Sequence, residues 1–363
     1  MSTTSIPTPE PAVTGKAVMQ ALVYRGPGKK FLEECAVPQI ASPTDAIVKM
    51  LKTTICGTDL HILKGDVPEV TDGRILGHEG IGVVERVGSA VTEVKPGDRV
   101  LISCITSCAK CEYCRRGMYS HCVRGGWILG HLIDGTQAEY VRIPYADTSL
   151  YRLPAGMDPE SAVMLSDILP TAYECGILNG RVKPGDNIAI IGAGPIGLAA
   201  IMTARFFSPA QIIAVDFDRN RLEAAKKLGA TAALDGGNGK PVAKILEMTE
   251  GRGVDVAIEA VGVPASFVMC EDIVAPGGVI ANIGVHGTKV DLHLERLWSA
   301  NIAITTRLVD TAATPMLLRA VQSQKLDPKP LVTHRFAFDA LLDAYDTFGR
   351  AAETHALKVI AGF

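Results

Sequence analysis

Five of the nine cysteines crowd between Cys104 and Cys122, and four of them, Cys108, Cys111, Cys114 and Cys122, have the spacing C-x2-C-x2-C-x7-C. Four thiolates this close in sequence can surround one tetrahedral zinc ion, and such a closed shell leaves no position for a substrate. Disulfide bonding is the alternative, but tight clustering favours metal ligation. We therefore predict a structural zinc site in this cysteine lobe (residues 104–122). Cys104 falls outside the spacing and is expected to be buried or to line a pocket.

Two further residues of types that zinc prefers lie nearer the N-terminus. Cys56 occurs in the segment TTICGTDLH (residues 53–61), and His78 occurs in GHEG (residues 77–80). A thiolate and an imidazole are ordinary zinc ligands, although either residue taken alone usually has a purely structural role. Their presence on one chain with a nucleotide loop and a cysteine lobe favours a second metal site.

The nucleotide loop is GAGPIG, formed by Gly192, Ala193, Gly194, Pro195, Ile196 and Gly197. It follows the apolar segment NIAII and precedes a helical pattern, which is the context that gives the motif meaning. Gly192 is expected to make the tight turn, Gly194 to let the backbone approach a pyrophosphate, and Gly197 to let the helix pack on the strand. The free N–H groups of the helix then face the phosphates. A glycine-rich turn without a ligand is the less favoured alternative.

An acidic residue ends the next predicted strand, QIIAVD, at Asp216. A carboxylate there accepts hydrogen bonds from the adenosine ribose hydroxyls and repels a 2′-phosphate, so NAD is favoured over NADP. Arg221 follows five residues later and could reach the same ribose or a phosphate. The alternative for Arg221 is a solvated charge on a helix.

The elements that must position these residues form two regions with different sequence patterns. From residue 17 to about residue 166, short extended segments alternate with Gly- and Pro-rich turns, which predicts a β-rich, barrel-like domain. After a helical stretch at residues 164–178, apolar strands and helices alternate, which predicts a parallel sheet that is buried on both faces. The final segment, ALKVIAGF, is expected to be a terminal strand that joins the first domain.

Composition sets the broad class. The chain has 363 residues, 47% hydrophobic and 21% charged, with a formal net charge of −3, which suits two globular domains and gives no electrostatic case for nucleic acid or membrane. No apolar run approaches the roughly 18 residues of a membrane helix. The first sixteen residues show no secretory pattern and are predicted to be a loose tail, so we expect a cytoplasmic protein.

The chain resembles the zinc-containing medium-chain alcohol dehydrogenases from end to end, apart from roughly the first sixteen residues. GTDLH, GHE, the cysteine lobe and GAGPIG occur in the family's order. The resemblance implies an α/β protein with a GroES-like catalytic domain (residues 17–168 and 309–363) and a doubly wound Rossmann NAD-binding domain (residues 169–308). It also implies two zinc ions per subunit and a homo-oligomer, with a tetramer favoured over a dimer. The strand near residues 302–306 would then pair across a two-fold axis.

The resemblance assigns the second metal site residue by residue. Cys56 and His78 match the first two ligands of the catalytic zinc. Asp167 takes the place of the usual third cysteine, as in bacterial secondary alcohol dehydrogenases and glutathione-independent formaldehyde dehydrogenases. Glu79 resembles the acid that can swing in as a ligand, and Asp59 resembles the partner that orients the zinc-bound histidine.

The remaining assignments concern substrate and cofactor. Thr58 matches the hydroxyl that touches the substrate oxygen, and His61 matches the end of a proton relay. Ile105 and Trp127 resemble walls of the apolar substrate pocket. Thr171 and Lys358 resemble residues at the nicotinamide ribose and the pyrophosphate; because Gly57 stands where some relatives place an arginine, Lys358 is expected to compensate.

The expected function is the reversible oxidation of primary or secondary alcohols to aldehydes or ketones by hydride transfer to NAD. One alternative is a formaldehyde dehydrogenase or aldehyde dismutase that holds NAD tightly, because such relatives share an aspartate at the third ligand position. The other is a non-catalytic nucleotide-binding relative, which the presence of Cys56, His78 and Asp167 disfavours.

Overall fold

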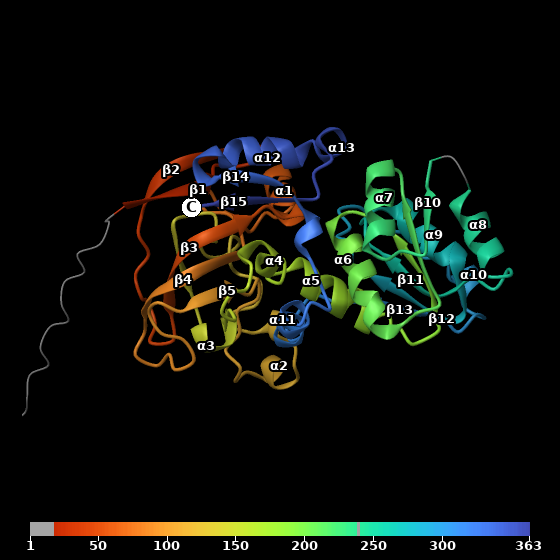
Figure 1. Cartoon of the computed structure of the whole chain (residues 1–363), viewed down its shortest axis with the longest axis horizontal. Coiled ribbons are helices and arrows are strands. Elements are labelled where there is room, and N and C mark those ends of the chain that lie inside the picture. Colours follow the sequence, from red (N-terminus) through yellow and green to blue (C-terminus); the bar gives the residue numbers. More distant parts are fainter. Residues whose placement is uncertain (1–17, 238–239) are drawn as a thin grey trace, which may run out of the picture.

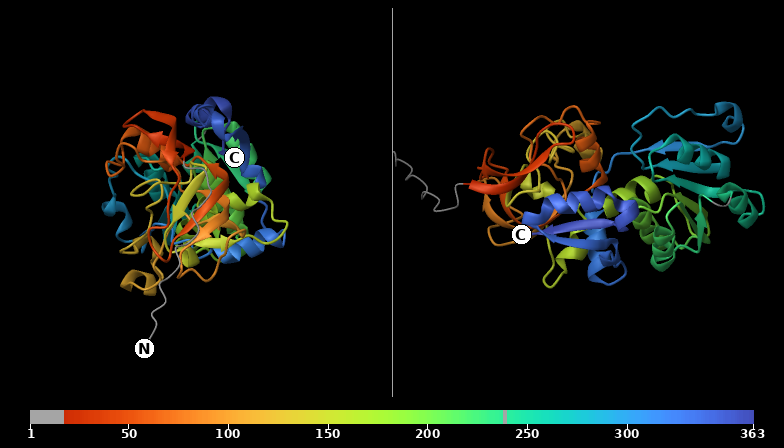
Figure 2. Two further views of the ribbon diagram at one scale, coloured as in Figure 1. Left: turned by 90° about the vertical axis from the view of Figure 1, so that its left-hand side faces the viewer. Right: turned by 90° about the horizontal axis from the view of Figure 1, so that it is seen from above.

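The computed structural model describes residues 18–237 and 240–363, so the predicted tail at residues 1–16 lies outside the described residues. Two sheet-centred domains lie side by side along the long axis of the molecule (Figure 1). The view from above shows the same arrangement, with the chain's first and last segments together in one domain (Figure 2). We call this the first domain and the other the parallel-sheet domain.

The first domain contains a two-stranded antiparallel sheet and a larger seven-stranded sheet of order β14-β15-β3-β4-β5-β7, in which β6 also pairs with β3. The C-terminal strand β15 pairs antiparallel with β3 and parallel with β14, which confirms the prediction that the last segment joins the first domain. The strands of this domain are β1 (Val18–Tyr24), β2 (Lys30–Ala36), β3 (Ala46–Thr54), β4 (Gly80–Val87), β5 (Arg99–Ile102), β6 (Tyr140–Ile143), β7 (Leu150–Arg152), β14 (Val332–Ala337) and β15 (Lys358–Gly362).

The parallel-sheet domain has six strands in the order β10-β9-β8-β11-β12-β13, and every neighbouring pair is parallel. The chain runs outward from β8 to β10 and then returns to β11 beside β8, so the switch in strand order lies between β8 and β11. Open sheets of this kind bind ligands at the carboxyl ends of the strands beside that switch. The strands are β8 (Asn187–Ile191), β9 (Gln211–Asp216), β10 (Ala232–Asp235), β11 (Val254–Glu259), β12 (Val274–Asn282) and β13 (Ala303–Thr306).

Short helices connect these strands, and the longest have ten residues. Those of the parallel-sheet domain are α6 (Pro195–Ala204), α7 (Arg219–Leu228), α8 (Pro241–Met248), α9 (Pro264–Ile273) and α10 (Leu294–Leu297). The others are α1 (Gly57–Lys64), α2 (Glu112–Arg115), α3 (Ala146–Ser149), α4 (Pro159–Val163), α5 (Ile168–Thr171), α11 (Thr314–Gln322), α12 (Leu341–Gly349) and α13 (Ala351–Thr354).

The helix predicted over residues 164–178 is wrong in its first part. Asp167 has the non-helical backbone angles φ −144° and ψ −67°, and α5 begins only after it. A π-helix then continues from Ala172 to Leu178. Asp167 is therefore the N-cap residue of α5, and from this position its carboxylate reaches Cys56 and His78.

A shared apolar core joins the two domains. One cluster of buried side chains includes Ile81 and Leu101 from the first sheet, Ile188 and Ile190 from the parallel sheet, and Leu169 from α5 between them. Packing of this kind holds the facing edges of the domains in register. Within residues 18–237 and 240–363, no helix is both long enough and apolar enough to cross a membrane.

Candidate active site

The cysteine lobe brings together the four sulfur atoms of Cys108, Cys111, Cys114 and Cys122, all within 4.8 Å of one another. None of the nine cysteines is disulfide-bonded. Backbone N–H groups of Cys114 and Val123 lower the pKa of the Cys111 thiol to about 6, which favours the thiolate that a metal requires. The donor set therefore fits a structural zinc ion of the predicted kind.

A second cluster gathers Cys56, His78, Glu79 and Asp167, whose ligand atoms also lie within 4.8 Å of one another. Cys56 caps the N-terminus of α1, His78 and Glu79 precede β4, and Asp167 precedes α5. Asp167 Oδ2 lies 3.2 Å from His78 Nε2 and 3.7 Å from Cys56 Sγ. Three segments far apart in sequence thus converge on one point, as the resemblance implied for Cys56, His78 and Asp167.

The cluster is buried and rich in anionic groups. Burial raises the pKa of the Cys56 thiol. Burial alone would lower the pKa of His78, but Asp167 and Cys56 outweigh it and hold that pKa well above its usual value. Burial alone would raise the pKa of Asp167, but His78 and Thr171 hold it well below its usual range. Buried thiol, imidazole and carboxylate groups that compete for protons in this way fit a divalent cation such as zinc.

Glu79 belongs to the cluster but is tied back by an ion pair. Its Oε2 accepts hydrogen bonds from Lys358 Nζ and Thr54 Oγ1, and the ammonium also donates to the carbonyl oxygen of Ile55 at 3.2 Å. The side chains of Glu79 and Lys358 are each only 1% exposed. Glu79 Oε1 is buried and has no hydrogen-bond partner among the described residues.

The contact between Lys358 and the cofactor pyrophosphate stays a prediction, and the structure adds a second set of partners for this residue. Its ammonium group is enclosed against Glu79 and the Ile55 carbonyl, so its charge serves the metal cluster. Compensation by Lys358 for the arginine missing at Gly57 likewise stays a prediction. A Cβ atom at Gly57 would have no described atom within 4 Å, so the space around this position is open.

Asp59 lies beside His78 and is held by polar contacts. Its Oδ2 accepts from the Cys56 N–H at 2.9 Å and from Gln137 Nε2 at 3.2 Å, while its Oδ1 lies 3.9 Å from His78 Nδ1. Gln137 Oε1 in turn accepts from the Tyr345 hydroxyl at 2.8 Å. Gln137 and Tyr345 are buried supporting residues that could not be selected from the sequence, because their partners lie 78 and 208 positions away.

The three predicted polar residues around the cluster occupy different places. Thr58 Oγ1 lies 3.7 Å from Cys56 Sγ, beside the metal cluster. His61 lies one turn later on α1, where its side chain is 33% exposed and Nδ1 is 2.8 Å from Asp66 Oδ2. Thr171 donates its hydroxyl to Asp167 Oδ1 at 2.5 Å, so it fixes a predicted metal ligand, a role that the sequence did not suggest.

Trp127 places an aromatic edge on the metal cluster. Its ring centroid is 6.3 Å from that of His78, with an interplanar angle of 79°. Trp127 also packs against a buried apolar group that contains Cys104 and Ile105, so Cys104 is buried as predicted. His131 also stacks on Trp127, with ring centroids 4.3 Å apart, and its Nδ1 lies 3.0 Å from the Trp127 carbonyl oxygen. His131 was not selected from the sequence.

The glycine loop lies at the carboxyl end of β8, beside the switch in strand order. Gly192 has φ +101°, and a Cβ atom at Gly197 would meet the Gly192 carbonyl oxygen at 1.8 Å, so both positions require glycine. A Cβ atom at Gly194 would meet only Arg221 Nη1 among the described atoms, at 3.9 Å. The loop therefore leaves an open cradle at the N-terminus of α6 with a guanidinium over it, which fits a pyrophosphate.

Asp216 lies beside this cradle at the end of β9. Its Oδ2 accepts from the Ala193 N–H at 2.7 Å, and its Oδ1 accepts from the Asp218 N–H at 2.9 Å. The carboxylate thus braces the glycine loop and the following turn. This bracing contact adds to the role that the sequence suggested for it.

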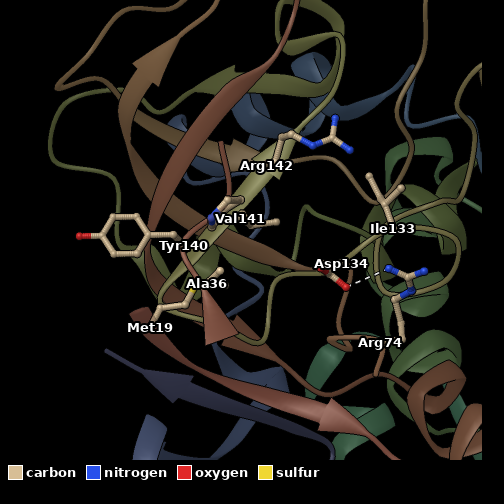
Figure 3. A pocket seen from close by; sticks show the side chains of 9 residues that line it. Met19, Ala36, Arg74, Ile133, Asp134, Tyr140, Val141 and Arg142 are labelled. Carbon is tan, nitrogen blue, oxygen red and sulfur yellow. Dashed lines mark hydrogen bonds and ion pairs between the residues drawn. The ribbon is translucent and has the colours of Figure 1, made fainter. Parts of the chain in front are cut away.

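A separate cavity of about 230 Å³ lies in the first domain, between β1, β2 and β6. Figure 3 shows Arg74 and Asp134 paired across one side of it, with a nitrogen-to-oxygen distance of 2.9 Å. None of the predicted site residues is among those that line this cavity. It is therefore not the site of the chemistry discussed above.

Comparison with known proteins gives two family matches. Residues 42–155 match the alcohol dehydrogenase GroES-like domain, and residues 195–323 match the zinc-binding dehydrogenase family. An alcohol dehydrogenase from Cupriavidus necator is 36% identical over 355 residues, covering 92% of this chain and 95% of that protein. The NADP-dependent isopropanol dehydrogenase of Thermoanaerobacter brockii is 35% identical over 84% of this chain and 88% of its own length.

A solved structure agrees with these matches. The apo form of zinc-dependent alcohol dehydrogenase 2 from Streptococcus pneumonia is 52% identical and superposes with a TM-score of 0.91. The match covers 95% of this chain and 98% of that one.

Proposed function

Because this chain belongs to the zinc-containing medium-chain alcohol dehydrogenase family and is an alcohol dehydrogenase, we propose that it oxidises primary and secondary alcohols reversibly, with NAD as hydride acceptor. Its fold is the expected GroES-like domain joined to a Rossmann domain. The observation that carries the proposal is the buried convergence of Cys56, His78 and Asp167 at the face between the domains. The named relatives are alcohol dehydrogenases, which disfavours the aldehyde dismutase and the non-catalytic alternatives.

The roles of the metal ligands follow from their chemistry. When bound, a zinc ion acidifies an alcohol hydroxyl, and a nicotinamide ring accepts the hydride. We assign Cys56, His78 and Asp167 as the residues that would hold this ion, with Thr171 fixing Asp167 and Asp59 lying beside His78. A second, structural zinc ion would be held by Cys108, Cys111, Cys114 and Cys122, giving two ions per subunit.

Proton removal is assigned to residues of α1. Thr58 lies beside the metal cluster, where its hydroxyl can accept a hydrogen bond from the substrate hydroxyl. His61 follows three positions later on the same helix face, half-exposed and paired with Asp66. Thr58 would take up the substrate's proton while it gives up its own hydroxyl proton toward His61, whose exposed imidazole would pass that proton on to water.

The choice of NAD rests on Asp216. Its carboxylate stands at the end of β9, where it would accept the ribose hydroxyls and repel a 2′-phosphate. Arg221 is the opposing consideration, because the T. brockii relative is named as NADP-dependent. The guanidinium of Arg221 lies over Gly194, however, which directs it toward a pyrophosphate on the glycine loop.

The substrate pocket is assigned to Trp127 and Ile105, which bound the metal cluster with apolar surface. An apolar wall favours small aliphatic alcohols over sugars. The carboxylate ligand Asp167 and the isopropanol dehydrogenase relative support a preference for secondary alcohols.

We further propose that the chain forms a homo-oligomer, with a tetramer favoured. Strand β13 lies at the edge of the parallel sheet, and exposed apolar side chains accompany it, including Ile304 (37% exposed) and Trp298 (78% exposed). An unpaired edge with apolar neighbours suits pairing with a second copy. The cytoplasmic location stays a prediction that rests on the clustered free thiols.

A substrate panel tests the proposal. Purified zinc-loaded enzyme is mixed with primary, secondary and aromatic alcohols, each with NAD or NADP, and NAD(P)H formation is followed by near-ultraviolet absorbance. We expect turnover with NAD and the highest kcat/KM for a small secondary alcohol. Absence of turnover with every alcohol, together with NAD released on denaturation, would contradict the proposal and favour an aldehyde dismutase.

A further inference from the structure

Three loops meet at the carboxyl edge of the parallel sheet, where β8, β11 and β12 end. The glycine loop lies against the loop after β11, because a Cβ atom at Gly192 would be 2.7 Å from Val261 Cγ2. The loop after β11 lies against the loop after β12 in the same way, because a Cβ atom at Gly262 would be 2.3 Å from the Val285 carbonyl oxygen. Since the strand order switches between β8 and β11, these loops border the crevice in which a dinucleotide binds.

Glu259, the last residue of β11, holds the loop after β11 in place through hydrogen bonds. It is fully buried, and its Oε1 accepts hydrogen bonds from the N–H groups of Val261 and Gly262 at 2.9 Å and from Ser266 Oγ at 2.5 Å. Its other oxygen, Oε2, is also buried and has no hydrogen-bond partner among the described residues. A buried carboxylate oxygen without a partner is costly, so the group that approaches it is informative.

The group that approaches Glu259 Oε2 is His286, from the loop after β12, with Nε2 at 3.3 Å. The same nitrogen lies 2.8 Å from Asn282 Oδ1. Asn282 Nδ2 donates to the Gly284 carbonyl at 2.9 Å, so its Oδ1 faces the ring as an acceptor. Both neighbours of Nε2 are therefore acceptors, which places a proton on that nitrogen.

His286 thus bridges β11 and the loop after β12. A loop that contains glycine at Gly284 and Gly287 loses much conformational freedom when it is fixed. The N–H groups of Ile283 and Gly284 bond the start of this loop to the Glu259 carbonyl, and the His286 bridge adds a side-chain contact further along it. Val261 and Val285 remain 49% and 66% exposed beside it, so apolar surface is presented at the crevice rather than packed away.

We propose that His286 is a positioning residue for the nicotinamide cofactor: by bridging Glu259 and Asn282, it holds the loop after β12 at the crevice in the form that the cofactor binds. The inference rests on the proposed function, since it requires the dinucleotide to occupy the glycine loop. A loop that is already ordered before the cofactor binds loses less conformational freedom on binding, so the affinity for the cofactor is higher. Loss of a bridge worth about one hydrogen bond weakens cofactor binding roughly threefold to tenfold.

The test compares three variants in the zinc-loaded enzyme. In His286→Gln the side-chain amide nitrogen replaces Nε2 and can keep the bridge, whereas His286→Asn and His286→Leu cannot. NADH dissociation constants are measured by fluorescence titration without substrate, beside Tm and the steady-state kcat and KM for NAD. We expect the Asn and Leu variants to raise the NADH dissociation constant and the KM for NAD threefold to tenfold, while the Gln variant stays within about twofold of wild type.

A control separates positioning from general loosening of the domain. His293→Leu removes another imidazole–carboxylate contact, with Glu271 of α9, at 2.6 Å. We expect this control to lower Tm without raising the NADH dissociation constant. The inference is overturned if His286→Leu binds NADH like wild type, if His286→Gln is as impaired as His286→Leu, or if His293→Leu weakens NADH binding equally. Should wild type bind neither NADH nor NADPH, the proposed cofactor itself fails, and this inference fails with it.

Discussion

Replacing Lys358 by methionine removes the cation from a buried ion pair next to the metal cluster. The Lys358 ammonium touches Glu79 Oε2 and the Ile55 carbonyl, and the side chains of Lys358 and Glu79 are each 1% exposed. Methionine keeps most of the length and apolar bulk of lysine, so the change isolates the charge. Glu79 is then left as a buried carboxylate close to Asp167 and Cys56, with only Thr54 still bonded to its Oε2.

The size of the effect follows from that burial. Removing one partner of a buried pair costs about 3–5 kcal/mol, because the remaining charge is left without compensation. For a domain of 150–250 residues this corresponds to a decrease in Tm of roughly 6–20 °C. Replacing both partners leaves no orphaned charge, so Lys358→Met with Glu79→Gln is expected to recover most of the loss.

The test compares wild type, both single variants and the double variant, each loaded with zinc. Their thermal unfolding is monitored by circular dichroism. Lys52→Met is the matched control, because Lys52 lies on the neighbouring strand β3 and its contact with Glu160 is long, at 3.9 Å, and partly exposed. That control is expected to lose less than about 1 kcal/mol. A Lys358→Met variant as stable as the control, or a double variant whose loss equals the sum of the single losses, would refute the reasoning.

Three further outcomes are expected. Cys111→Ser should remove one zinc ion per subunit and lower Tm, and a metal assay that finds no lost zinc would contradict the structural assignment. Thr58→Val should lower kcat about 10²- to 10⁴-fold while the NADH dissociation constant stays unchanged, which steady-state kinetics and fluorescence titration check together. Asp216→Gly should shift the NADP-to-NAD ratio of kcat/KM toward NADP by at least roughly tenfold and should also weaken NAD binding, because the Ala193 N–H loses its acceptor; an unchanged ratio would remove Asp216 from cofactor selection.

The parts of the fold that could be predicted are those encoded by contiguous residues. The glycine loop, the strands that flank it and the four-cysteine spacing each occupy a short stretch, so periodicity and spacing are enough to find them. Asp216 was found for the same reason, because it ends the strand after the loop. The C-terminal strand was also recognisable, since residues 356–363 are mostly apolar and include the β-branched Val359 and Ile360.

The parts that could not be predicted depend on contacts between distant segments. Glu79 and Lys358 are 279 positions apart, and nothing in the sequence near Lys358 signals a buried ammonium group. The helix predicted over residues 164–178 was wrong at its start because the tertiary position of Asp167 overrides local helix propensity. Gln137 and Tyr345 support Asp59 by the same kind of long-range packing, and such pairs become visible only when the strands and helices are placed.

The central claim is that Cys56, His78 and Asp167 hold a zinc ion on which alcohol oxidation depends. The most direct measurement determines zinc per subunit and the rate of NADH formation from a secondary alcohol in the same preparations of wild type and His78→Ala. The account predicts two zinc ions in wild type, one in the variant, and a rate at least about 10³-fold lower in the variant. A variant that keeps both ions, or one that loses an ion and still turns over alcohol at the wild-type rate, would contradict the account.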